Sequence, residues 1–510
     1  MKTIINKIDK VFILTLCIFV SVSCSDEFFD RPPEDGYSID GFYANDDQVR
    51  ASTNHLYTRS WYEYFTNPFY AIGELSSGNG RTWDGATSDF QNFSVLNNNP
   101  QVETAWRSLW GEVSQCNAII NGMDNVPASI SPAVLNNALG EARFMRAITY
   151  FYMVRIWGDL PIIENNLDYV FDPQINKNPV SDVYTFIKND LKYAIDNCFS
   201  KPNADTGKVT KETAQALLAK VYLYEKDYSN AKIMSEKVIN SGNYDLFEGS
   251  YNELFLTEND NNIESMAALQ WSTIGEYGHG NAAQAFFAVS GITGFGSGWS
   301  SIGPSIDLQD SYEPGDERKY GTIMERGNFY PNLNGGYTVP DDFDVQGTDA
   351  GIKKYVVGNP ETNGGGGAMA SPNNTYLLRY ADVLLIHAEA ILAGANSTTN
   401  SAALRSVNKV RNRAGLGDIT EIFADRLLHE RRVEFAFEGE YFFDIQRLDR
   451  TEAINMLSNQ ERGTYSTDAV PVVWSEKFTP TEGDFIFPYP QVDTQRNPLL
   501  LEPPVPYDFN

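Results

Sequence analysis

Apolar residues recur at helical spacing along much of the chain. In residues 139–158 they follow the i, i+3, i+4, i+7, i+8 pattern that places side chains on one face of an α-helix. This stripe consists of Phe144, Ala147, Ile148, Phe151 and Tyr152. Gly158 and Pro161 follow it, and both residue types end helices. The pattern predicts a long helix with one buried face.

A second stripe of the same spacing lies in residues 213–226. Its members are Ala214, Leu217, Leu218, Val221 and Tyr222. Asp227 and Tyr228 predict a turn, and residues 229–241 predict a second helix that ends at Gly242. With its small alanines, the pair at 216–239 is similar to a tetratricopeptide-type helical hairpin.

Further helices are expected wherever apolar periodicity is sustained. These are 45–65, 101–123, 180–198, 376–394, 400–413 and 420–449. We therefore expect an all-α scaffold built from helical pairs.

The periodicity fades between residues 248 and 373, where Gly and Asn become dense. Residues 264–272 predict a short strand, and the rest predicts loops, including a GGGG run at 364–367. A loop-rich stretch of this length inside a compact protein is typical of function. Residues 77–100 form a second, earlier loop-rich segment. The last 40 residues hold eight of the 24 prolines, which predicts an extended tail without helix.

Composition narrows the class of protein. The 510 residues have 42% hydrophobic and 21% charged side chains, as in ordinary globular proteins. The formal net charge is −28, and no run of five to eight Lys and Arg occurs, which argues against nucleic-acid binding. Aromatic residues reach 13%, more than a core needs.

The first residues predict a targeting segment. Three lysines precede an apolar run at 11–22, which is too short to span a bilayer. The run ends at Ser21-Val22-Ser23-Cys24, which resembles a lipobox, with Ser21 where Leu is usual. We expect lipidation at Cys24 and a mature chain of charge −30; the alternative is an ordinary secretory signal. The following Ser-Asp-Glu resembles the surface-export signal of certain Gram-negative lipoproteins.

No catalytic or metal-binding motif is present. The four His have no metal-ligand spacing, and neither a G-x-S-x-G nor a Walker loop occurs. Asp342-Phe-Asp344-Val-Gln346-Gly347 imitates the start of a calcium loop, but Lys353 stands where the closing Glu would be. We predict no cofactor. Cys116 and Cys198 are more consistent with two buried thiols than with a bridge.

The densest acidic helix is predicted at 427–449. Glu430, Glu434 and Glu438 recur at i+4 and repel one another unless they are paired. Nearby arginines are the available partners: Arg411, Arg413, Arg431, Arg432 and Arg447. A structural ion network is favoured over an acid–base pair.

The tryptophans divide into core and loop residues. Trp61, Trp106, Trp110 and Trp157 fall on predicted helices, and Trp271 falls on the strand; these five are expected in the core. Trp83, Trp299 and Trp474 fall in loops. Trp83 has Asn79, Arg81 and Asp84 beside it, and this mixture suits a sugar, whose apolar face stacks on an aromatic ring while its hydroxyls bind polar groups. The competing interpretation is a loop Trp folded back onto the body.

Six segments resemble the SusD/RagB family of outer-membrane nutrient-binding lipoproteins, in the order that family shows. They are 105–120 (AWRSLWGEVSQCNAII), 140–163, 379–390 (RYADVLLIHAEA), 407–416 (VNKVRNRAGL), 427–448 and 485–500. Two departures are Tyr489, where Ile is usual, and the last residues, which lack the family's usual motif.

The resemblance implies a tetratricopeptide-like scaffold, a lipid-anchored surface location, and a SusC-like TonB-dependent transporter as partner. It implies glycan capture without catalysis, on an aromatic arc built from the early loop and the insertion. The nearest matches here are Trp83 with Asn79 and Arg81, and the region from Tyr277 to Trp299, which includes Phe295.

The corresponding division of the chain has five parts. These are a signal peptide (1–23), a lipidated linker (24–44), an N-terminal helical part (45–247), a ligand-binding insertion (248–373) and a C-terminal helical part with the tail (374–510). Two other functions stay open: a peptide-binding protein on the same scaffold, and a glycoside hydrolase with an unrecognised carboxylate pair. The acidic charge favours an uncharged or weakly charged glycan.

Overall fold

The computed structural model describes residues 43–124, 126–273, 278–293, 298–466 and 469–509. Its long helices are α5 (Pro100–Gly122), α6 (Pro132–Trp157), α7 (Val180–Asn197), α8 (Lys211–Tyr224), α9 (Tyr228–Ser241), α14 (Tyr380–Leu392), α15 (Ser401–Arg413), α16 (Ala424–Phe435) and α18 (Arg450–Asn459). The lipidation candidate Cys24 and the site candidates Tyr277 and Phe295 lie outside the described residues.

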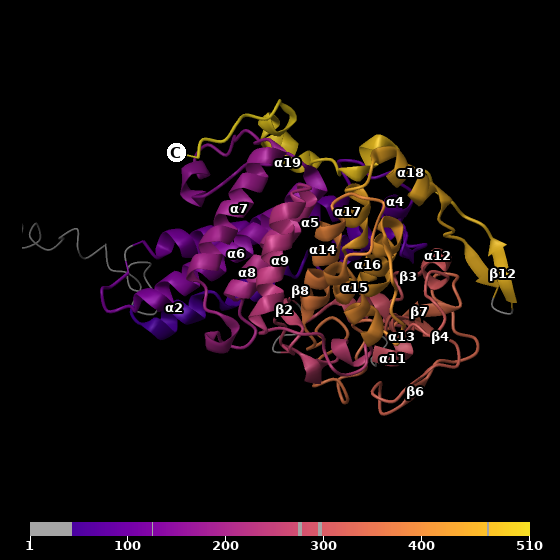
Figure 1. Cartoon of the computed structure of the whole chain (residues 1–510). Helices are drawn as coiled ribbons and strands as arrows, with labels where there is room; N and C mark the ends of the chain where they lie inside the picture. The colour runs from indigo at the N-terminus through magenta and orange to yellow at the C-terminus, as the bar shows by residue number, and fades with distance from the viewer. Residues whose placement is uncertain (1–42, 125, 274–277, 294–297, 467–468, 510) are drawn as a thin grey trace, which may run out of the picture.

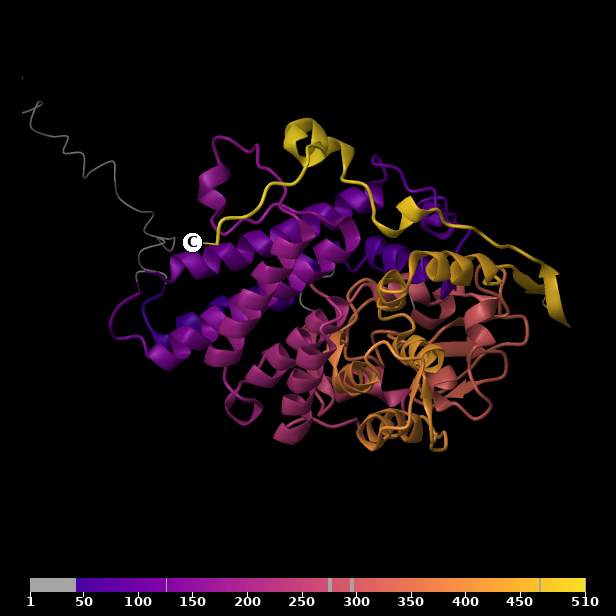
Figure 2. The same cartoon turned by 45° about the horizontal axis from the view of Figure 1, so that its top comes forward.

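Helices that follow one another along the chain also pack on one another. Contacts join α5 to α6, α6 to α7, α7 to α8, α8 to α9, α9 to α14 and α14 to α15. Figures 1 and 2 show α5 to α9 side by side in one half of the molecule and α14 to α16 in the other. The predicted stripe on α6 is buried, and the helix is enclosed on nearly all sides from Phe144 to Trp157. This arrangement confirms the helix-rich scaffold.

Local sequence signals set the ends of the α8–α9 pair. The Thr210 hydroxyl accepts a hydrogen bond from the Thr213 N–H at the start of α8, and the Asp227 carboxylate accepts one from the Asn230 N–H at the start of α9. Gly242 ends α9 in the left-handed conformation, with φ of 65°. The predicted turn and both predicted helices are confirmed.

Three predicted helices are wrong in part. Residues 45–65 form α2 (Asp46–Ser52) and two 3₁₀ turns, η3 (Asn54–Tyr57) and η4 (Arg59–Trp61). Residues 375–379 form a strand before α14 begins. The expected helix 420–449 ends at Phe435 and resumes as α17 (Tyr441–Gln446), because Phe437 and Gly439 adopt positive φ angles of 62° and 77°.

Short strands and helices lie in the loop-rich insertion and also in other parts of the chain. The strands pair in two-stranded antiparallel ladders: β1 (Gly80–Arg81) with β3 (Gly303–Pro304), β2 (Ser265–Leu269) with β8 (Thr375–Arg379), β4 (Ile323–Glu325) with β7 (Ala350–Ile352), β5 (Phe329–Tyr330) with β6 (Tyr337–Thr338), β9 (Ser397–Thr398) with β10 (Ile422–Phe423), and β11 (Thr464–Ser466) with β12 (Ala469–Trp474). Short helices fill the gaps: α3 (Asn67–Tyr70), α4 (Ser88–Gln91), α10 (Ala283–Phe287), α11 (Ser290–Thr293), α12 (Ile306–Gln309) and α13 (Glu317–Thr322). The predicted strand at 264–272 is confirmed as β2.

The C-terminal residues cross the helical half of the molecule. The Phe487 N–H donates to the Ile156 carbonyl, and the Val505 N–H donates to the Lys177 carbonyl. The expectation that proline excludes helix here is wrong for α19 (Gln491–Arg496), which lies between Pro490 and Pro498. Proline at the start of a helix costs no hydrogen bond, so short helices fit between prolines.

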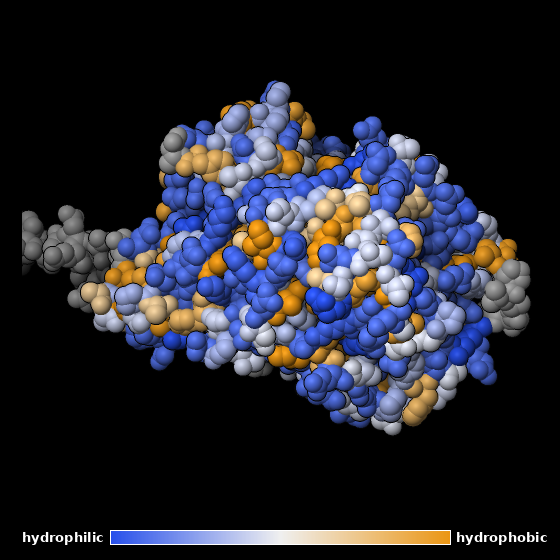
Figure 3. Space-filling model, in the orientation of Figure 1, coloured by the Kyte–Doolittle hydropathy of each residue, from blue (hydrophilic) through white to orange (hydrophobic). Residues whose placement is uncertain are grey.

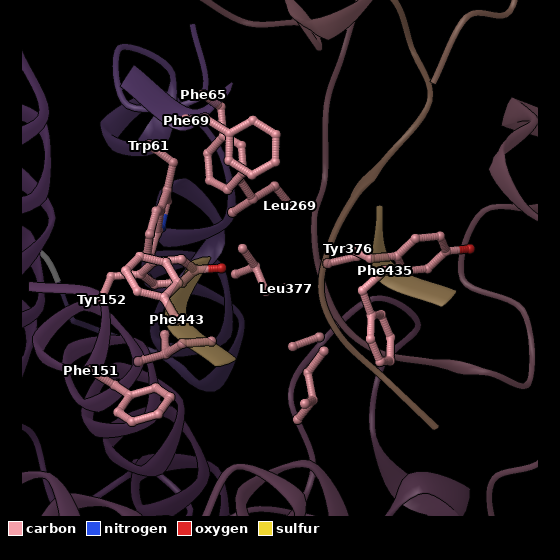
Figure 4. Packing of buried hydrophobic residues seen from close by; sticks show 14 of the residues in the cluster. Trp61, Phe65, Phe69, Phe151, Tyr152, Leu269, Tyr376, Leu377, Phe435 and Phe443 are labelled. Carbon is pink, nitrogen blue, oxygen red and sulfur yellow. The ribbon is translucent and has the colours of Figure 1, made fainter. Parts of the chain in front are cut away.

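One continuous core joins the two halves. Trp61 packs against Tyr152 of α6, and Tyr152 packs against Phe443 of α17, as Figure 4 shows. Phe65 packs on Trp61 and on Phe69 in the same cluster. The five tryptophans expected in the core pack there, with Trp110 only partly buried. In the part of the chain that the structure describes, no helix is long and apolar enough to cross a bilayer.

The predicted ion network is present and buried: Glu430 and Glu434 lie on α16, and Glu438 lies in the turn that follows it. Glu430 pairs with Arg318 and Arg411, Glu434 with Arg379 and Arg413, and Glu438 with Lys354 and Arg379. Of the arginines expected as partners, Arg411 and Arg413 take part, whereas Arg431, Arg432 and Arg447 pair with aspartates and with Glu389. Each of the three glutamates is therefore neutralised by neighbouring cations.

Glu112 of α5 is a buried carboxyl group, and no residue that the structure describes forms an ion pair with it. Burial raises its pKa to about 8, although hydrogen bonds from its neighbours, including the Cys116 thiol, act in the opposite direction. Cys116 and Cys198 are both free and buried, which confirms the expectation of two thiols.

We expect Glu112→Gln to stabilise the protein at neutral pH by about 3 kcal/mol. Below about pH 4.5 Glu112 is protonated in both the folded and the unfolded chain, so it does not reduce the stability of the wild type. As the pH rises towards 8 only the unfolded chain ionises freely, and the free energy of unfolding of the wild type therefore falls. Urea unfolding between pH 4 and 8 measures this slope, which should be shallower in the variant; a remainder persists because burial also raises the pKa of Glu74 and of Asp260 to about 7. Glu103→Gln, on the accessible side of the same helix, is the control and should keep the slope.

Candidate functional site

Three loops from distant parts of the chain meet at one surface: the segments around Trp83, Ser300 and Gln346. The β1–β3 pair brings Gly80 opposite Pro304, and the Thr82 hydroxyl donates to the Ser301 carbonyl at 2.7 Å. Gln346 belongs to the third loop and connects the other two. Its side-chain carbonyl oxygen accepts from the Trp83 backbone N–H, and its amide donates to the Ser300 carbonyl, each at 2.6 Å. Trp83 and Trp299 therefore stand on loops that one glutamine side chain connects.

Trp83 is 58% exposed, and the rest of its ring contacts Arg81 and Gly347. The Arg81 guanidinium lies over its ring, 4.7 Å from the centroid. Gly347 has a positive φ of 75°, and a Cβ there would lie 2.4 Å from Cη2 of Trp83. Only glycine leaves room for the ring, so the structure presents Trp83 to solvent and does not fold it back onto the body.

The polar residues around Trp83 are occupied by the protein. Asn79 is buried: its amide donates to Glu74, and its carbonyl oxygen accepts from Arg432. Arg81 is also buried. The Asp84 carboxylate accepts from the Ala86 N–H and closes the turn after Trp83. Asn79 and Arg81 therefore hold the loop in place, whereas the sequence suggested them as sugar contacts; Asp84 is partly exposed and stays a candidate contact.

Trp299 is 49% exposed and stands against the short helix α10. Its backbone N–H donates to the Ala285 carbonyl at 2.8 Å. Its ring packs edge-on against the Phe286 ring, at a centroid distance of 5.0 Å. The side chain is thus anchored along one edge while half of its surface stays open.

A third tryptophan, Trp474, belongs to the same region and is 65% exposed. It ends β12, where it is paired with Thr464 of β11. This β11–β12 hairpin stands out from the body in Figures 1 and 2, and Figure 3 shows apolar atoms at this end of the molecule. The sequence indicated only that Trp474 lies in a loop; the short apolar run at 469–474, with three β-branched valines, was the signal for a strand.

Acidic groups lie beside the β11–β12 hairpin. Asp310 accepts a hydrogen bond from the Tyr465 hydroxyl, and burial together with Asp310, Asp349 and Glu461 raises the pKa of that phenol. No group of three or more His, Cys, Asp or Glu that could hold a metal ion occurs among the described residues. The three tryptophans thus present open aromatic faces, with carboxylates at the hairpin end.

The chain matches two family models. Residues 264–505 match the SusD family, and residues 38–223 match a family described as starch-binding associating with outer membrane. A SusD-like protein of Bacteroides ovatus is 34% identical over 98% of both chains, and SusD-like protein P2 of Formosa agariphila is 28% identical over 96% of this chain and 97% of its own. The protein belongs to the SusD family.

Solved structures agree with this assignment. One, a crystal structure with xylogluco-oligosaccharide, has a TM-score of 0.83 and 34% identity, and the match covers 91% of this chain and 99% of the other. A laminarin-binding SusD-like protein shares the fold with a TM-score of 0.69 at 23% identity, with 89% of this chain and 98% of the other covered.

Proposed function

We propose that this protein is a glycan-binding lipoprotein of the outer cell surface. The observation that carries the proposal is the pair of half-exposed rings, Trp83 and Trp299, on loops that Gln346 connects. A tryptophan face matches the apolar face of a sugar ring, and neighbouring sugars can stack on successive aromatics. The 34%-identical structure with a xylogluco-oligosaccharide makes xyloglucan the first ligand to test.

The proposed role is capture without catalysis. The densest acidic segment supports this role, because Glu430 and Glu434 of α16 and Glu438 after it are buried and paired with cations. Carboxylates held in this way cannot exchange protons with a glycosidic oxygen.

The proposed setting follows from the family and the N-terminus. Lipidated Cys24 would anchor the chain in the outer membrane, and a SusC-like TonB-dependent transporter would receive the glycan. The helical pairs would serve as a tetratricopeptide-like scaffold crossed by an extended tail, and the insertion at 248–373 would supply much of the binding surface. Anchoring beside a transporter raises the effective ligand concentration at its entrance.

We expect Trp83→Ala and Trp299→Ala each to weaken glycan binding by about ten- to a hundredfold, because an aromatic side chain buried by a ligand contributes about 1.5–3 kcal/mol. Native gels cast with xyloglucan, laminarin or starch measure the retardation. Phe423→Ala removes an exposed ring from β10, outside these loops, and is the control.

Retardation by one polymer that each tryptophan variant loses would support the proposal. Absence of retardation by every polymer would contradict glycan binding. Release of reducing ends from a retarding polymer would contradict the non-catalytic role.

A further inference from the structure

The β11–β12 hairpin touches the Trp83 loop through Gly347. A Cβ built on Gly347 would lie 2.4 Å from Cη2 of Trp83 and 2.7 Å from Cγ2 of Thr464. These two atoms are therefore no further apart than the sum of those distances. Thr464 is the register partner of Trp474, and partners across an antiparallel ladder are adjacent. A continuous surface runs from Trp83 through Thr464 to Trp474.

Arg81 fixes the base of the hairpin at the same point. Its Nε donates to the Arg462 carbonyl at 2.9 Å, and its Nη2 pairs with the Glu476 carboxylate at 3.3 Å. These two residues lie just outside the hairpin and bond to each other, since the Arg462 N–H donates to the Glu476 carbonyl at 2.9 Å. One buried guanidinium therefore supports the Trp83 ring and holds both strands of the hairpin.

The outer end of this surface is apolar and open. Val473 is 64% exposed and its neighbour Trp474 is 65% exposed, so two adjacent apolar side chains are open to a ligand here. Charged groups of both signs lie near the hairpin: Glu461 accepts from the Ser475 hydroxyl and Asp310 accepts from Tyr465, whereas Arg81 and Lys477 are cationic. The formal net charge of −28 favours an uncharged ligand over a highly anionic one.

We propose that Trp474 is a third stacking residue and that the β11–β12 hairpin extends the binding surface, so that the protein selects long chains of neutral sugars over short oligosaccharides. This inference rests on the glycan-binding function proposed above. Trp299 and Trp83 bind the nearer part of the chain, and Trp474 binds the part that continues past the hairpin. A short oligosaccharide fills the first part alone.

The test compares one polymer with its own fragment. Tryptophan fluorescence titrations would use xyloglucan and a short xylogluco-oligosaccharide on wild type, Trp474→Ala, Trp474→Phe and the control Phe423→Ala. We expect Trp474→Ala to weaken polymer binding by about tenfold and oligosaccharide binding less than twofold. Trp474→Phe should restore most of the polymer affinity, because a ring is again present to stack.

Three outcomes separate the inference from the function on which it depends. Equal polymer affinity in wild type and Trp474→Ala, with binding lost in Trp83→Ala, would overturn the role of Trp474 alone. Equal weakening of polymer and oligosaccharide would overturn the length selection. Absence of any binding by the wild type would overturn the xyloglucan assignment and this inference with it.

Discussion

Replacement of Glu434 by Gln is expected to destabilise the fold by about 3–5 kcal/mol, the typical cost of removing one partner from a buried ion network. Glu434 is fully buried, and its carboxylate pairs with Arg379 and Arg413, with Arg318 at 3.6 Å. Glutamine keeps the shape of the side chain and removes the charge. The three guanidinium groups would then share the remaining carboxylates and repel one another within the core.

The same network makes stability depend on pH in the acid range. Burial alone would raise the pKa of Glu434, but the charges of Arg413, Arg379 and Arg318 outweigh it and hold the pKa at about 2. A lowered pKa contributes stability that is present above the unfolded value of about 4.5 and is lost as the pH falls towards 2. Wild type should therefore lose stability between pH 4.5 and 2 more steeply than Glu434→Gln.

Urea unfolding at pH 7 and at several acidic pH values measures both effects. Asp425→Asn is the matched control, since Asp425 lies on the same helix and is exposed. The control should leave the free energy of unfolding within about 0.5 kcal/mol of the wild-type value. A midpoint for Glu434→Gln equal to that of the control would show that the arginines are stabilised without this carboxylate.

Part of this network could be predicted from the sequence. The i+4 spacing of Glu430, Glu434 and Glu438 requires cations, and Arg411 and Arg413 were at hand. Arg318 and Arg379 come from segments 112 and 55 residues away from their hydrogen-bond partners Glu430 and Glu434. Local spacing carries no information about such pairings, because they depend on how the insertion and β8 fold against α16.

The candidate site was predictable to a similar extent. Loop composition pointed to Trp83 and Trp299, and both rings are half open. The neighbours of Trp83 were harder to place, because a polar residue in a loop looks the same in sequence whether it faces solvent or another loop. Asn79 and Arg81 are buried by segments more than 350 residues away, at Arg432 and Arg462. Trp474 was missed for the same reason: its proximity to Trp83 exists only through Gly347.

The break in the predicted helix 420–449 has an identifiable cause. Gly439 approaches η5 (Ala71–Leu75), where its N–H donates to the buried Glu74 carboxylate at 2.6 Å. A Cβ on Gly73 would lie 2.6 Å from Cα of Gly439, so the two backbones are in direct contact. A continuous helix could not bring the Gly439 N–H to Glu74, because that N–H would bond within the helix. The tertiary contact therefore overrides the helical periodicity.

We expect Gly439→Ala to destabilise the protein by about 3 kcal/mol, the sum of two separable costs. Gly439 has φ of +77°, where an L side chain costs about 1–2 kcal/mol. The new methyl group would also lie 2.5 Å from Cε2 of Phe69, and overpacking of this kind typically costs about 1–3 kcal/mol. Phe69 is itself packed in the core, so its ring has little freedom to move away.

Two further glycines separate these costs in thermal or urea unfolding. Gly242→Ala places a methyl group at φ of +65° with nothing within 4 Å, so it should show the backbone cost alone. Gly417→Ala has neither a positive φ nor a neighbour and should be close to neutral. If Gly439→Ala costs no more than Gly242→Ala, the contact with Phe69 relaxes freely and cannot be what breaks the helix. If it costs clearly more, close packing against α3 and η5 is what holds residues 436–440 out of the helix that their sequence favours.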